Sequence, residues 1–423
     1  MSQRIAIVHY TPPGIVGGVE LIIGEQARLL RSRGHDVLVI AGRSASDSDE
    51  VRVLPEIDAA TPESMAVEAE LANGVVSPRF YRLRDSIAAR IGPLLSSRDV
   101  VLVHNAYTLH FSMPLTSVLW ELAAQRPPTS MVAWCHDLAW ANQLYTPAMH
   151  SGYPWDLLRV PAPGVRYVVV SKERQTELSA LWDGDGRADI LVAPNGIDPY
   201  SFLGLSPETR AIVHRFRLFD REMVLLLPVR VTRRKNVELA MRAVRCLRDR
   251  DIDVCFLVTG PVAPHHPSRS QTYLDELKRL REDLALNDAV IFAADELGHN
   301  LDYATVAQLY RVVDALLFPS SQEGFGLPIL EAGLARIPVV LADIPVFREV
   351  GGADVWTFEL GAAPDDVADR ILEAVQGRPS ALYRRVLREY RWDAIIDQFV
   401  TPLLRAAAST ADTSAIPHVE APS

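Results

Sequence analysis

The sequence has 423 residues, more than one ordinary hydrophobic core accommodates, so we expect two large domains. Hydrophobic residues make up 48% and charged residues 23% of it, which is typical of a packed globular protein and excludes extensive disorder. Lysine and arginine total 43 against 53 aspartate and glutamate, a formal charge of −10, which argues against a nucleic-acid-binding protein because phosphate contacts need a cationic surface.

Short apolar runs alternate with helical patterns in the first half of the chain. A helix is expected over 19–33, between the first two of a series of strands. The expected strands cover 5–8, 37–41, 100–104, 131–135, 167–170 and 190–193. Alternation of this kind predicts right-handed crossovers and a parallel, Rossmann-like sheet.

The same pattern runs a second time. The expected strands are 224–227, 254–259, 289–292, 315–318 and 339–341. We therefore predict an α/β protein with domains at 1–205 and 206–391, the boundary following the turn Pro194-Asn195-Gly196. An amphipathic helix over 392–407 is expected to return to the first domain, and 408–423 to form a flexible tail.

Compartment is indicated by the cysteines and the N-terminus. Cys135, Cys246 and Cys255 have neither metal-ligand spacing nor the pattern of a disulfide framework. Residues 1–9 enter a strand-like run without the features of a signal peptide, and no apolar stretch of about 20 residues could span a bilayer. We expect a cytoplasmic protein.

Three loops that follow predicted strands carry the candidate chemistry. The first contains Gly17 and Gly18, which let the backbone approach a ligand and open a helix whose amides favour an anion. A purely structural turn explains these two glycines equally well. Because ligands of parallel sheets bind beyond the carboxyl ends of the strands, the other two loops lie at positions of the same kind.

The second loop, 320–332, holds two glutamates eight positions apart around a glycine-rich turn. Gly324 and Gly326 open a helix, and Glu323 and Glu331 flank its first turn. A carboxylate accepts hydrogen bonds from vicinal hydroxyls, so two of them around an amide nest describe a nucleotide-sugar cradle. The alternative makes Glu323 a helix-capping acid and Glu331 a solvated surface residue.

The third loop, 228–236, is cationic. Arg230 and Lys235 could offset the charge that develops on a departing diphosphate without a metal ion. Surface basic residues of no particular role would show the same pattern. His265 and His266 lack further metal ligands and are expected in a solvated loop, so we expect no metal and no cofactor.

The set of motifs resembles glycosyltransferase family 4. Glu323 to Glu331 is similar to the E-x7-E motif of these retaining enzymes of GT-B architecture, and Arg230 with Lys235 is similar to their donor-phosphate pair. Gly17-Gly18 resembles their N-terminal glycine loop, and the segment 194–198 their interdomain signature. The matches occur in the family's order from residue 5 to about 392.

The resemblance implies a role for each matching residue. Glu331 would bind the nucleoside ribose, Glu323 the transferred sugar, and Arg230 and Lys235 the diphosphate. The amides around Gly324, Phe325, Gly326 and Leu327 would meet the donor. His136 would lie near the transferred sugar, where a neutral imidazole can hydrogen-bond a hydroxyl; a purely structural histidine is the alternative. His104, Asn105, Asp137 and Ser171 are candidates for the acceptor side, although a helix start explains Ser171 equally well.

The phosphate loop departs from the family pattern. Thr232-Arg233-Arg234 stand where many members have an acidic or proline-containing turn, and Asn236 stands where many have glycine. Neither change removes a donor contact that the resemblance implies.

The expected activity is transfer of a hexose from a UDP- or GDP-linked sugar to a hydroxyl acceptor, with retention at the anomeric carbon. The two acids and two cations are expected to converge across the hinge between two domains that face a common cleft. Two alternatives are a sugar-nucleotide epimerase of the same fold and a non-catalytic sugar-nucleotide-binding protein. The basic helical pattern over 78–91 would allow peripheral membrane contact, or it marks a surface helix packed on the sheet.

Overall fold

The computed structural model of the chain describes residues 2–15, 17–44, 51–125, 129–182, 190–261, 267–376 and 380–408. The chain folds into two units, one made of residues up to Ile197 together with those from Trp392 onward, the other of Asp198 to Arg391. This division lies ahead of the expected boundary at 205/206. The reason is that Asp198 caps helix α6 (Pro199–Phe202), which packs through Tyr200 on Phe219 of the second unit.

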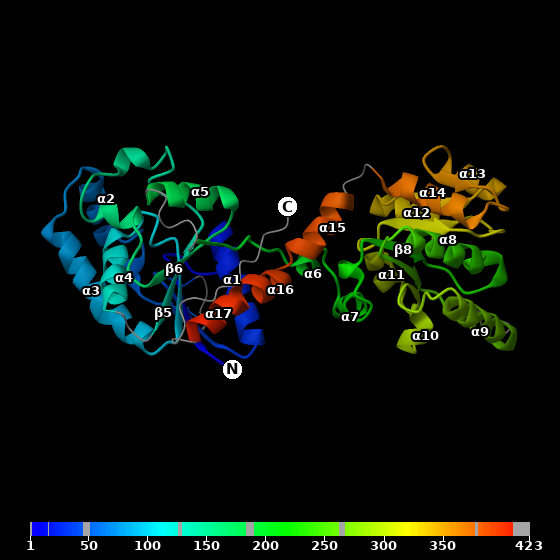
Figure 1. The fold of residues 1–423 in the computed structure, drawn as a ribbon, viewed down its shortest axis with the longest axis horizontal. Helices are drawn as coiled ribbons and strands as arrows, with labels where there is room; N and C mark the ends of the chain where they lie inside the picture. The colour runs from blue at the N-terminus through cyan, green and yellow to red at the C-terminus, as the bar shows by residue number, and fades with distance from the viewer. Residues whose placement is uncertain are drawn as a thin grey trace. The chain divides into compact units, whose positions relative to one another are not determined.

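The first unit is built on a seven-stranded parallel sheet with the order β3-β2-β1-β4-β5-β6-β7, which confirms the predicted sheet (Figure 1). Its strands are β1 (Arg4–Val8), β2 (Asp36–Ala41), β3 (Val51–Val53), β4 (Val100–His104), β5 (Ser130–Cys135), β6 (Val165–Val169) and β7 (Ile190–Val192). In the centre, Ile5 pairs with Val37 on one side and with Val100 on the other. Strand β3 was not predicted, because three half-exposed residues carry no periodic signal.

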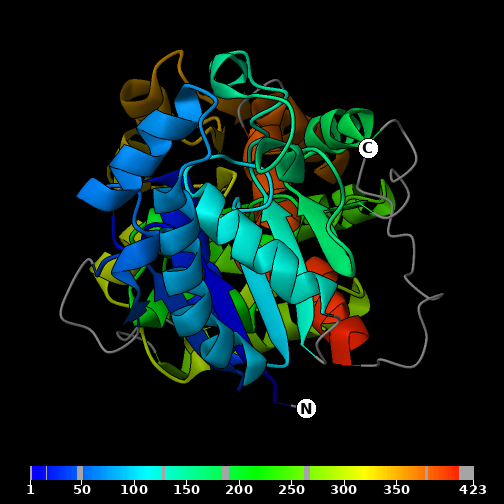
Figure 2. The ribbon, with the colours of Figure 1, turned by 90° about the vertical axis from the view of Figure 1, so that its left-hand side faces the viewer.

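Helices cover both faces of this sheet. They are α1 (Gly18–Ser32), α2 (Pro62–Ala72), α3 (Pro78–Ser96), α4 (Met113–Ala124), α5 (Lys172–Leu181), α16 (Trp392–Ile395) and α17 (Thr401–Ala408), with short turns η1 (Pro55–Ile57), η2 (Thr146–Ala148), η3 (Trp155–Leu158) and the π-helical η7 (Ile396–Val400). Helices α3 and α4 pack together in front of the strands in Figure 2, and α1 with the C-terminal helices forms a separate core with the other face.

Helix α3 contains the basic segment 78–91, for which membrane contact and packing on the sheet were the two alternatives. Its apolar residues Phe80, Leu83 and Ile87 are buried in the core of the unit. An amphipathic helix that docks on a membrane needs that stripe on its free face. The segment is therefore a surface helix whose apolar stripe packs against its own domain, and this stripe is not available to a lipid surface.

The C-terminal segment returns to the first unit, as predicted. The backbone N–H of Trp392 donates to the carbonyl of Ile197 at 3.1 Å, and a Cβ on Gly196 would lie 2.6 Å from the Trp392 ring. Glycine at position 196 thus lets the indole pack on the turn at which the chain leaves the sheet. The segment consists of α16, η7 and α17, where a single helix was expected. The predicted tail lies outside the described residues from 409 onward.

The second unit repeats the architecture with a six-stranded parallel sheet of order β10-β9-β8-β11-β12-β13. The strands are β8 (Met223–Leu227), β9 (Val254–Val258), β10 (Val290–Phe292), β11 (Ala315–Phe318), β12 (Val339–Ala342) and β13 (Trp356–Phe358). Every residue of β8, β9 and β11 is buried, as expected for strands covered on both faces. Strand β13, a short edge strand, was not predicted.

Ten helices of the second unit lie within the described residues: α6, α7 (Pro207–Arg215), α8 (Val237–Asp249), α9 (Pro267–Asp283), α10 (Ala293–Leu297), α11 (Tyr303–Leu309), α12 (Leu327–Ala335), α13 (Pro345–Gly351), α14 (Pro364–Val375) and α15 (Ser380–Glu389), with turns η5 (Leu218–Asp220) and η6 (Arg233–Lys235). A buried ion pair holds α15 in place. Arg384 donates to Asp314 at 2.9 Å and to the carbonyls of Leu218 and Val312, and Asp314 also accepts from the N–H of Val224.

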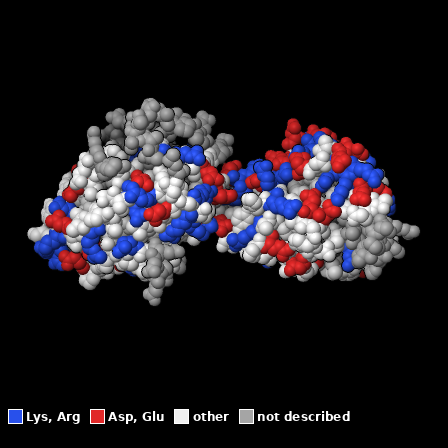
Figure 3. All heavy atoms as spheres, turned by 90° about the horizontal axis from the view of Figure 1, so that it is seen from below, with Lys and Arg blue, Asp and Glu red and all other residues white. Residues whose placement is uncertain are grey.

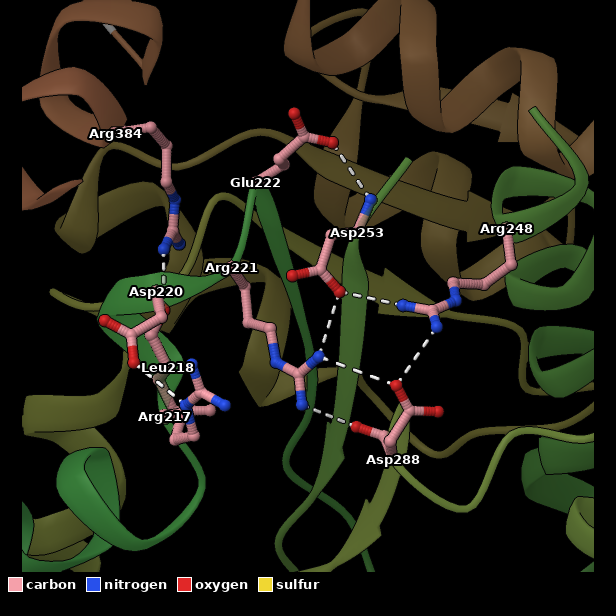
Figure 4. A network of polar contacts seen from close by, with 9 residues as sticks. All are labelled: Arg217, Leu218, Asp220, Arg221, Glu222, Arg248, Asp253, Asp288 and Arg384. Atoms are coloured by element: carbon pink, nitrogen blue, oxygen red, sulfur yellow. Dashed lines mark hydrogen bonds and ion pairs between the residues drawn. The ribbon is translucent and has the colours of Figure 1, made fainter. Parts of the chain in front are cut away.

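Charged side chains pair with one another at the amino ends of β8 and β9 (Figure 4). Arg221 and Arg248 both contact Asp253, at 2.9 and 2.8 Å, and Arg248 reaches Asp288 at 3.0 Å. Glu222 accepts from the backbone N–H of Asp253 at 3.0 Å. This network satisfies the charges at the amino edge of the sheet, which is the edge opposite the loops of the candidate site.

Cationic and anionic side chains are interspersed on the face drawn in Figure 3. Mixed signs of this kind keep a surface free of a strong field of one sign. Within the described ranges, no helix has the length and apolar character needed to cross a membrane.

Both strand orders reverse direction at one place in each sheet. In the first unit the reversal lies between β1 and β4, and in the second between β8 and β11. Loops at the carboxyl ends of the two strands that flank such a reversal turn away from each other and leave a crevice, which is where open α/β sheets bind ligands. The predicted site residues follow these four strands or their neighbours.

Candidate functional site

Hydrogen bonds to backbone carbonyls join the two loops at the reversal of the second sheet. Strands β8 and β11 are paired neighbours, so the loops that follow them start side by side. The N–H of Ser321 donates to the carbonyl of Arg234 at 2.8 Å, and the guanidinium of Arg234 donates to the carbonyl of Gln322 at 2.9 Å. The loops over 228–236 and 319–326 therefore form one surface.

Lys235 and Glu323 form an ion pair at the centre of this surface. Nζ of Lys235 contacts Oε1 of Glu323, and the two side chains are only 7% and 9% exposed. Arg234, which is 49% exposed, contacts Oε2 of the same carboxylate at 3.1 Å. Burial lowers the pKa of Lys235, while the hydrogen bond that its ammonium donates to Glu323 opposes that shift. The structure thus brings Lys235 and Glu323 together, and it adds Arg234, which the sequence motif did not single out.

Arg230 occupies the same loop but not the ion pair. Its side chain is exposed and has no hydrogen bond or ion pair with any described residue. The loop itself is anchored, because the N–H of Val231 donates to the carbonyl of Pro261 at 3.0 Å. A Cβ on Gly260 would lie 2.0 Å from the carbonyl oxygen of Val229, so glycine there allows the loops after β8 and β9 to touch. Arg230 is a cation on a fixed backbone, open to an anion.

The N-terminus of α12 presents amides without a side-chain cap. Gly326 is the N-cap residue, with φ near +100°, a conformation that L side chains rarely adopt. A Cβ on Gly324 would meet open space, and the side chains of Phe325 and Leu327 are half or more exposed. Uncapped amides at a helix N-terminus favour an anion, as predicted for this turn.

Glu331 lies in the second turn of α12 and is held by Tyr310. The phenol hydroxyl donates to Oε2 of Glu331 at 2.7 Å. Tyr310 is buried, and both its burial and the neighbouring carboxylate raise its pKa, so it remains a donor. Glu331 is thus a positioned carboxylate rather than a solvated surface residue. The sequence carries no signal for Tyr310, because an aromatic residue at the end of a helix is most often part of a core.

A cavity of about 150 Å³ opens beside these loops at the carboxyl ends of β8, β9 and β10. Its lining joins backbone of the two anchored loops to polar side chains: Val231, Gly260, Pro261, Gln271, Leu274, Phe292, Ala294, Asp295 and Asn300. Lys278 contacts Asp295 at 2.7 Å. The cavity follows the loop of Arg230 directly, so a ligand that meets this cation could extend into it.

One expectation about this site was wrong. The two acids and two cations were expected to converge across a hinge, but Arg230, Lys235, Glu323 and Glu331 all belong to the second unit. Within that unit only Lys235 and Glu323 contact each other directly. The reason is that β8 and β11 are neighbours in one sheet, so the residues at their carboxyl ends meet without help from the other unit.

Three histidines gather at the reversal of the first sheet. His9 follows β1, His104 ends β4 and His136 follows β5. His104 is fully buried; its Nδ1 lies 3.0 Å from Nε2 of His136, and Nδ1 of His9 donates to its carbonyl at 3.1 Å. Burial lowers the pKa of all three imidazoles, that of His136 to about 3. Neutral rings are therefore present at physiological pH, as expected for His136.

Two acceptor-side candidates prove to be internal. His104 and Asn105 are 0% and 5% exposed, so neither lines a surface that an acceptor could touch. Asn105 has φ near +63°, and its side-chain oxygen accepts from the backbone N–H groups of His136, at 2.9 Å, and Asp137. Both residues hold the segment that carries His136. Their prediction as acceptor contacts was wrong because polarity at a strand end does not tell which residues face solvent.

Ser171 and Asp137 have structural partners. Ser171 is the N-cap of α5 and accepts from the N–H of Arg174 at 3.2 Å, which is the helix start considered as the alternative. The carboxylate of Asp137 accepts from the N–H of Leu138 and lies 3.7 Å from Arg174. Asp137 remains 30% exposed and keeps access to a ligand.

The glycine loop of the first unit leads into α1. Gly17 is the N-cap of this helix in an extended conformation, and a Cβ on Gly18 would meet open space. In the first turn, Glu20 accepts a hydrogen bond from Thr11 and lies 3.9 Å from Nε2 of His9. His9 and Glu20 were not predicted, although the strand-end rule that indicated His104 and His136 applies equally to His9.

The described residues offer no metal site. They contain no group of three or more His, Cys, Asp or Glu side chains placed to hold a metal ion. His265 and His266 lie outside the described residues.

Comparisons with known proteins agree on one class. Residues 16–200 match the family model described as Glycosyltransferase Family 4, and residues 210–390 match that described as Glycosyl transferases group 1. The chain is 24% identical to mannosylglucosylglycerate synthase of Thermotoga maritima, over 82% of each chain, and 26% identical to D-inositol 3-phosphate glycosyltransferase of Actinosynnema mirum, over 81% of each. A glycosyltransferase structure from Rickettsia africae aligns over 97% of this chain and 100% of its own, with 17% identity and a TM-score of 0.37.

Proposed function

Because the chain belongs to the family 4 glycosyltransferases, we propose that it transfers a hexose from a UDP- or GDP-linked sugar to a hydroxyl acceptor, with retention at the anomeric carbon. The observation that carries this proposal is the buried pair of Lys235 and Glu323 at the strand reversal of the second unit. A cation next to a carboxylate matches a ligand in which a diphosphate is next to sugar hydroxyls.

The diphosphate would be bound by cations and amides together. Lys235 and Arg230 supply positive charge, and the uncapped N-terminus of α12 supplies backbone donors. Bond breaking at the anomeric carbon places negative charge on the departing phosphate. Preorganised donors and cations stabilise that charge most in the transition state, which is the requirement for catalysis. We propose that they do so without a metal ion.

The two glutamates would hold the two ends of the donor. Glu331, oriented by Tyr310, would accept from the ribose hydroxyls, and Glu323 from hydroxyls of the transferred sugar. The cavity of about 150 Å³ beside the Arg230 loop is the place we propose for the nucleobase, since it continues from that loop along the strand ends. Donors and acceptors there include the backbone of Gly260 and the side chain of Asn300.

The first unit would supply His136 and the acceptor. A neutral imidazole can hydrogen-bond a hydroxyl of the transferred sugar. In the step we propose, the acceptor oxygen bonds to the anomeric carbon on the face that the phosphate leaves, the bond from that carbon to phosphate oxygen breaks, and the departing phosphate takes the hydroxyl proton. No enzyme nucleophile takes part, because both glutamates are committed to the donor.

The relatives suggest acceptors to try first. Their names indicate transfer onto a glycerate derivative in one case and onto D-inositol 3-phosphate in the other. We propose a small polyhydroxylated acceptor for this chain as well. We also propose action in the cytoplasm, since all three cysteines are free thiols, as is typical of proteins from a reducing compartment.

Labelled UDP-glucose and GDP-mannose test the proposal. The protein is incubated with each donor and with polyols, oligosaccharides or lipid-linked sugars, and Arg230→Ala and Glu331→Ala are compared with the native protein. Each variant is expected to weaken donor binding by roughly tenfold to a hundredfold, since each removes a hydrogen bond to a charged group. Glu373→Ala, on the exposed face of α14, is the control.

Three outcomes contradict parts of the proposal. Unchanged donor affinity and turnover in both variants would remove the site. A product of inverted anomeric configuration, read by proton NMR, would remove retention. Conversion of the donor to its epimer without an acceptor would identify an epimerase.

A further inference from the structure

The fully buried ring of His104 connects α1 to His136. Its plane is nearly parallel to those of Trp134 and His136, at interplanar angles of 22° and 20°, with ring centroids 5.9 and 5.3 Å away. Its Nε2 lies 3.1 Å from Oε1 of Gln26, and its Nδ1 lies 3.0 Å from Nε2 of His136. Gln26 is itself completely buried on α1. These three side chains form a hydrogen-bonded series from the helix to the ring proposed to contact the sugar.

Proton positions in this series follow from the chemistry of its two ends. A neutral imidazole has one N–H donor and one bare acceptor, and burial keeps His104 neutral by lowering its pKa. The amide oxygen of Gln26 can only accept, so Nε2 of His104 must carry the proton. Its Nδ1 is then bare and must accept, so Nε2 of His136 carries the proton in the second bond.

His136 is consequently left with a bare Nδ1. No described residue hydrogen-bonds this nitrogen, and the ring is partly exposed. The carboxylate of Glu20 lies 3.9 Å from Nε2 of His9. A bare nitrogen can only accept, so it can receive a hydrogen bond from a sugar hydroxyl but cannot donate one.

We propose that Gln26 is a positioning residue: through His104 it sets the tautomer of His136, so that His136 presents Nδ1 as a hydrogen-bond acceptor to a donor-sugar hydroxyl. The part about the sugar rests on the proposed function, whereas the tautomer does not. If the amide of Gln26 had the opposite orientation, its NH₂ group would donate to His104 and both rings would reverse, leaving His136 with Nδ1–H. The side chain of Gln26 therefore selects between an acceptor and a donor at the sugar.

A choice of this kind has a consequence for the hydroxyl. An acceptor nitrogen draws the hydroxyl proton toward the protein and leaves the hydroxyl oxygen free for a second donor. A donor nitrogen would compete with other N–H groups for that oxygen. The tautomer therefore determines in which direction the hydroxyl hydrogen bond runs, and it does so from a residue that touches no substrate.

Nitrogen-15 NMR of the histidine rings tests the tautomer directly, because protonated and bare imidazole nitrogens resonate in separate ranges. In the native protein, His136 is expected to show Nε2–H and bare Nδ1, and His104 the same. Assignment uses His104→Asn and His136→Asn. Nδ1–H on His136 of the native protein would overturn the proposal, whatever reaction the protein catalyses.

Gln26→Met tests the role of the amide at nearly constant volume. Without the acceptor on α1, the two proton arrangements of the His104–His136 pair are expected to become mixed. With UDP-glucose or GDP-mannose, whichever is turned over, kcat is expected to fall about tenfold, the low end for loss of an orienting outer partner, with an unchanged donor KM. Leu30→Met, on the same buried side of α1, controls for repacking and is expected to change neither tautomer nor kcat.

The two kinds of failure are distinguishable. If Gln26→Met keeps the native tautomer and the native kcat, Gln26 does not position His136 and the inference is wrong. If the tautomers are as stated but neither donor is turned over by the native protein, the proposed function fails while the assignment of proton positions holds.

Discussion

The hydroxyl of Tyr310 donates a 2.7 Å hydrogen bond to the carboxylate of Glu331 and connects the end of α11 to the second turn of α12. The phenol is buried, so the bond is not exchanged freely with water. A carboxylate at this position would otherwise sample several rotamers. Tyr310 therefore gives Glu331 one orientation before any ligand arrives.

Tyr310→Phe tests that orientation. The variant keeps the ring and removes only the donor, so the domain is expected to stay folded while the donor KM rises about tenfold, in line with about 1.4 kcal/mol for a hydrogen bond to a charged group. Initial rates against UDP-glucose and GDP-mannose measure it. Tyr303→Phe, at a site 73% exposed, is the control. An unchanged KM would show that Tyr310 does not serve donor binding.

The titration of Lys235 is expected to determine how kcat/KM falls at alkaline pH. Burial lowers its pKa from 10.5, so the ammonium is expected to lose its proton, and kcat/KM to fall, with a midpoint below 10.5. Lys235→Arg should move that loss to higher pH, because guanidinium stays charged. Arg234→Met removes the exposed cation on the same carboxylate, whose positive charge also lowers this pKa, and should raise the midpoint only slightly, because burial is the larger cause. A native profile that is flat up to pH 10.5 would contradict this assignment.

The same shift has a defined sign for stability. Between the lowered pKa of folded Lys235 and 10.5, the unfolded chain binds the proton and the folded chain does not. The free energy of unfolding therefore gains from Lys235 as pH rises through this window. Lys235→Met removes the gain, which urea titrations at pH 8 and 10 measure by difference.

The buried histidines predict loss of stability in acid. Folded His136 has a pKa of about 3, whereas the unfolded side chain titrates near 6.5, so below pH 6.5 only the unfolded state takes up the proton. Each such histidine lowers the free energy of unfolding by about 1.4 kcal/mol per pH unit as pH falls through the window. Urea titrations from pH 7 to 4.5 should show a shallower decline for His136→Asn than for the native protein. An equal slope would contradict the burial of His136 as the cause.

We expect the buried ion pair of Arg384 and Asp314 to contribute far more to the free energy of unfolding than a half-exposed ion pair does. Their side chains are 6% and 1% exposed, and Arg384→Ala would leave Asp314 as an uncompensated buried charge, with an expected cost of about 3–5 kcal/mol. Arg370→Ala breaks the half-exposed pair with Glu373 on α14 and should cost less than about 1 kcal/mol. Urea unfolding of both variants measures this contrast. Equal effects would show that the buried pair does not anchor α15.

Much of the fold follows from local patterns. The strand over 315–318 was predicted with the bounds of β11, and the strand over 100–104 with those of β4, because continuous apolar runs between helical periods depend on neighbours along the chain. The short strands β3 and β13 were not predicted, because three residues are too few to show a periodic pattern. The domain boundary moved to Ile197 because packing of α6 decides it, not the turn that precedes it.

The residues of the candidate site also fall into those that local sequence pattern identified and those that only long-range contacts reveal. Glu323, Lys235 and Arg230 were identified in loops that follow strands, and Glu331 in the helix that one of these loops opens. The end of a strand and the start of a helix are local properties. Tyr310 and Gln26 were not identified, because each acts through one contact with a residue far away along the chain. Asn105 illustrates the opposite error: its chemistry fits a ligand, but its side chain is used by the backbone of His136.

By itself the sequence determined the two parallel sheets, the order of the strand-end loops and the residue types that those loops offer, because these depend on the periodicity of the chain over one element at a time. Only the tertiary structure decided that Lys235 meets Glu323 and that Gln26 meets His104. Such meetings depend on which strands become neighbours and which face of a helix turns inward, and both are set by burial of apolar surface summed over a whole domain.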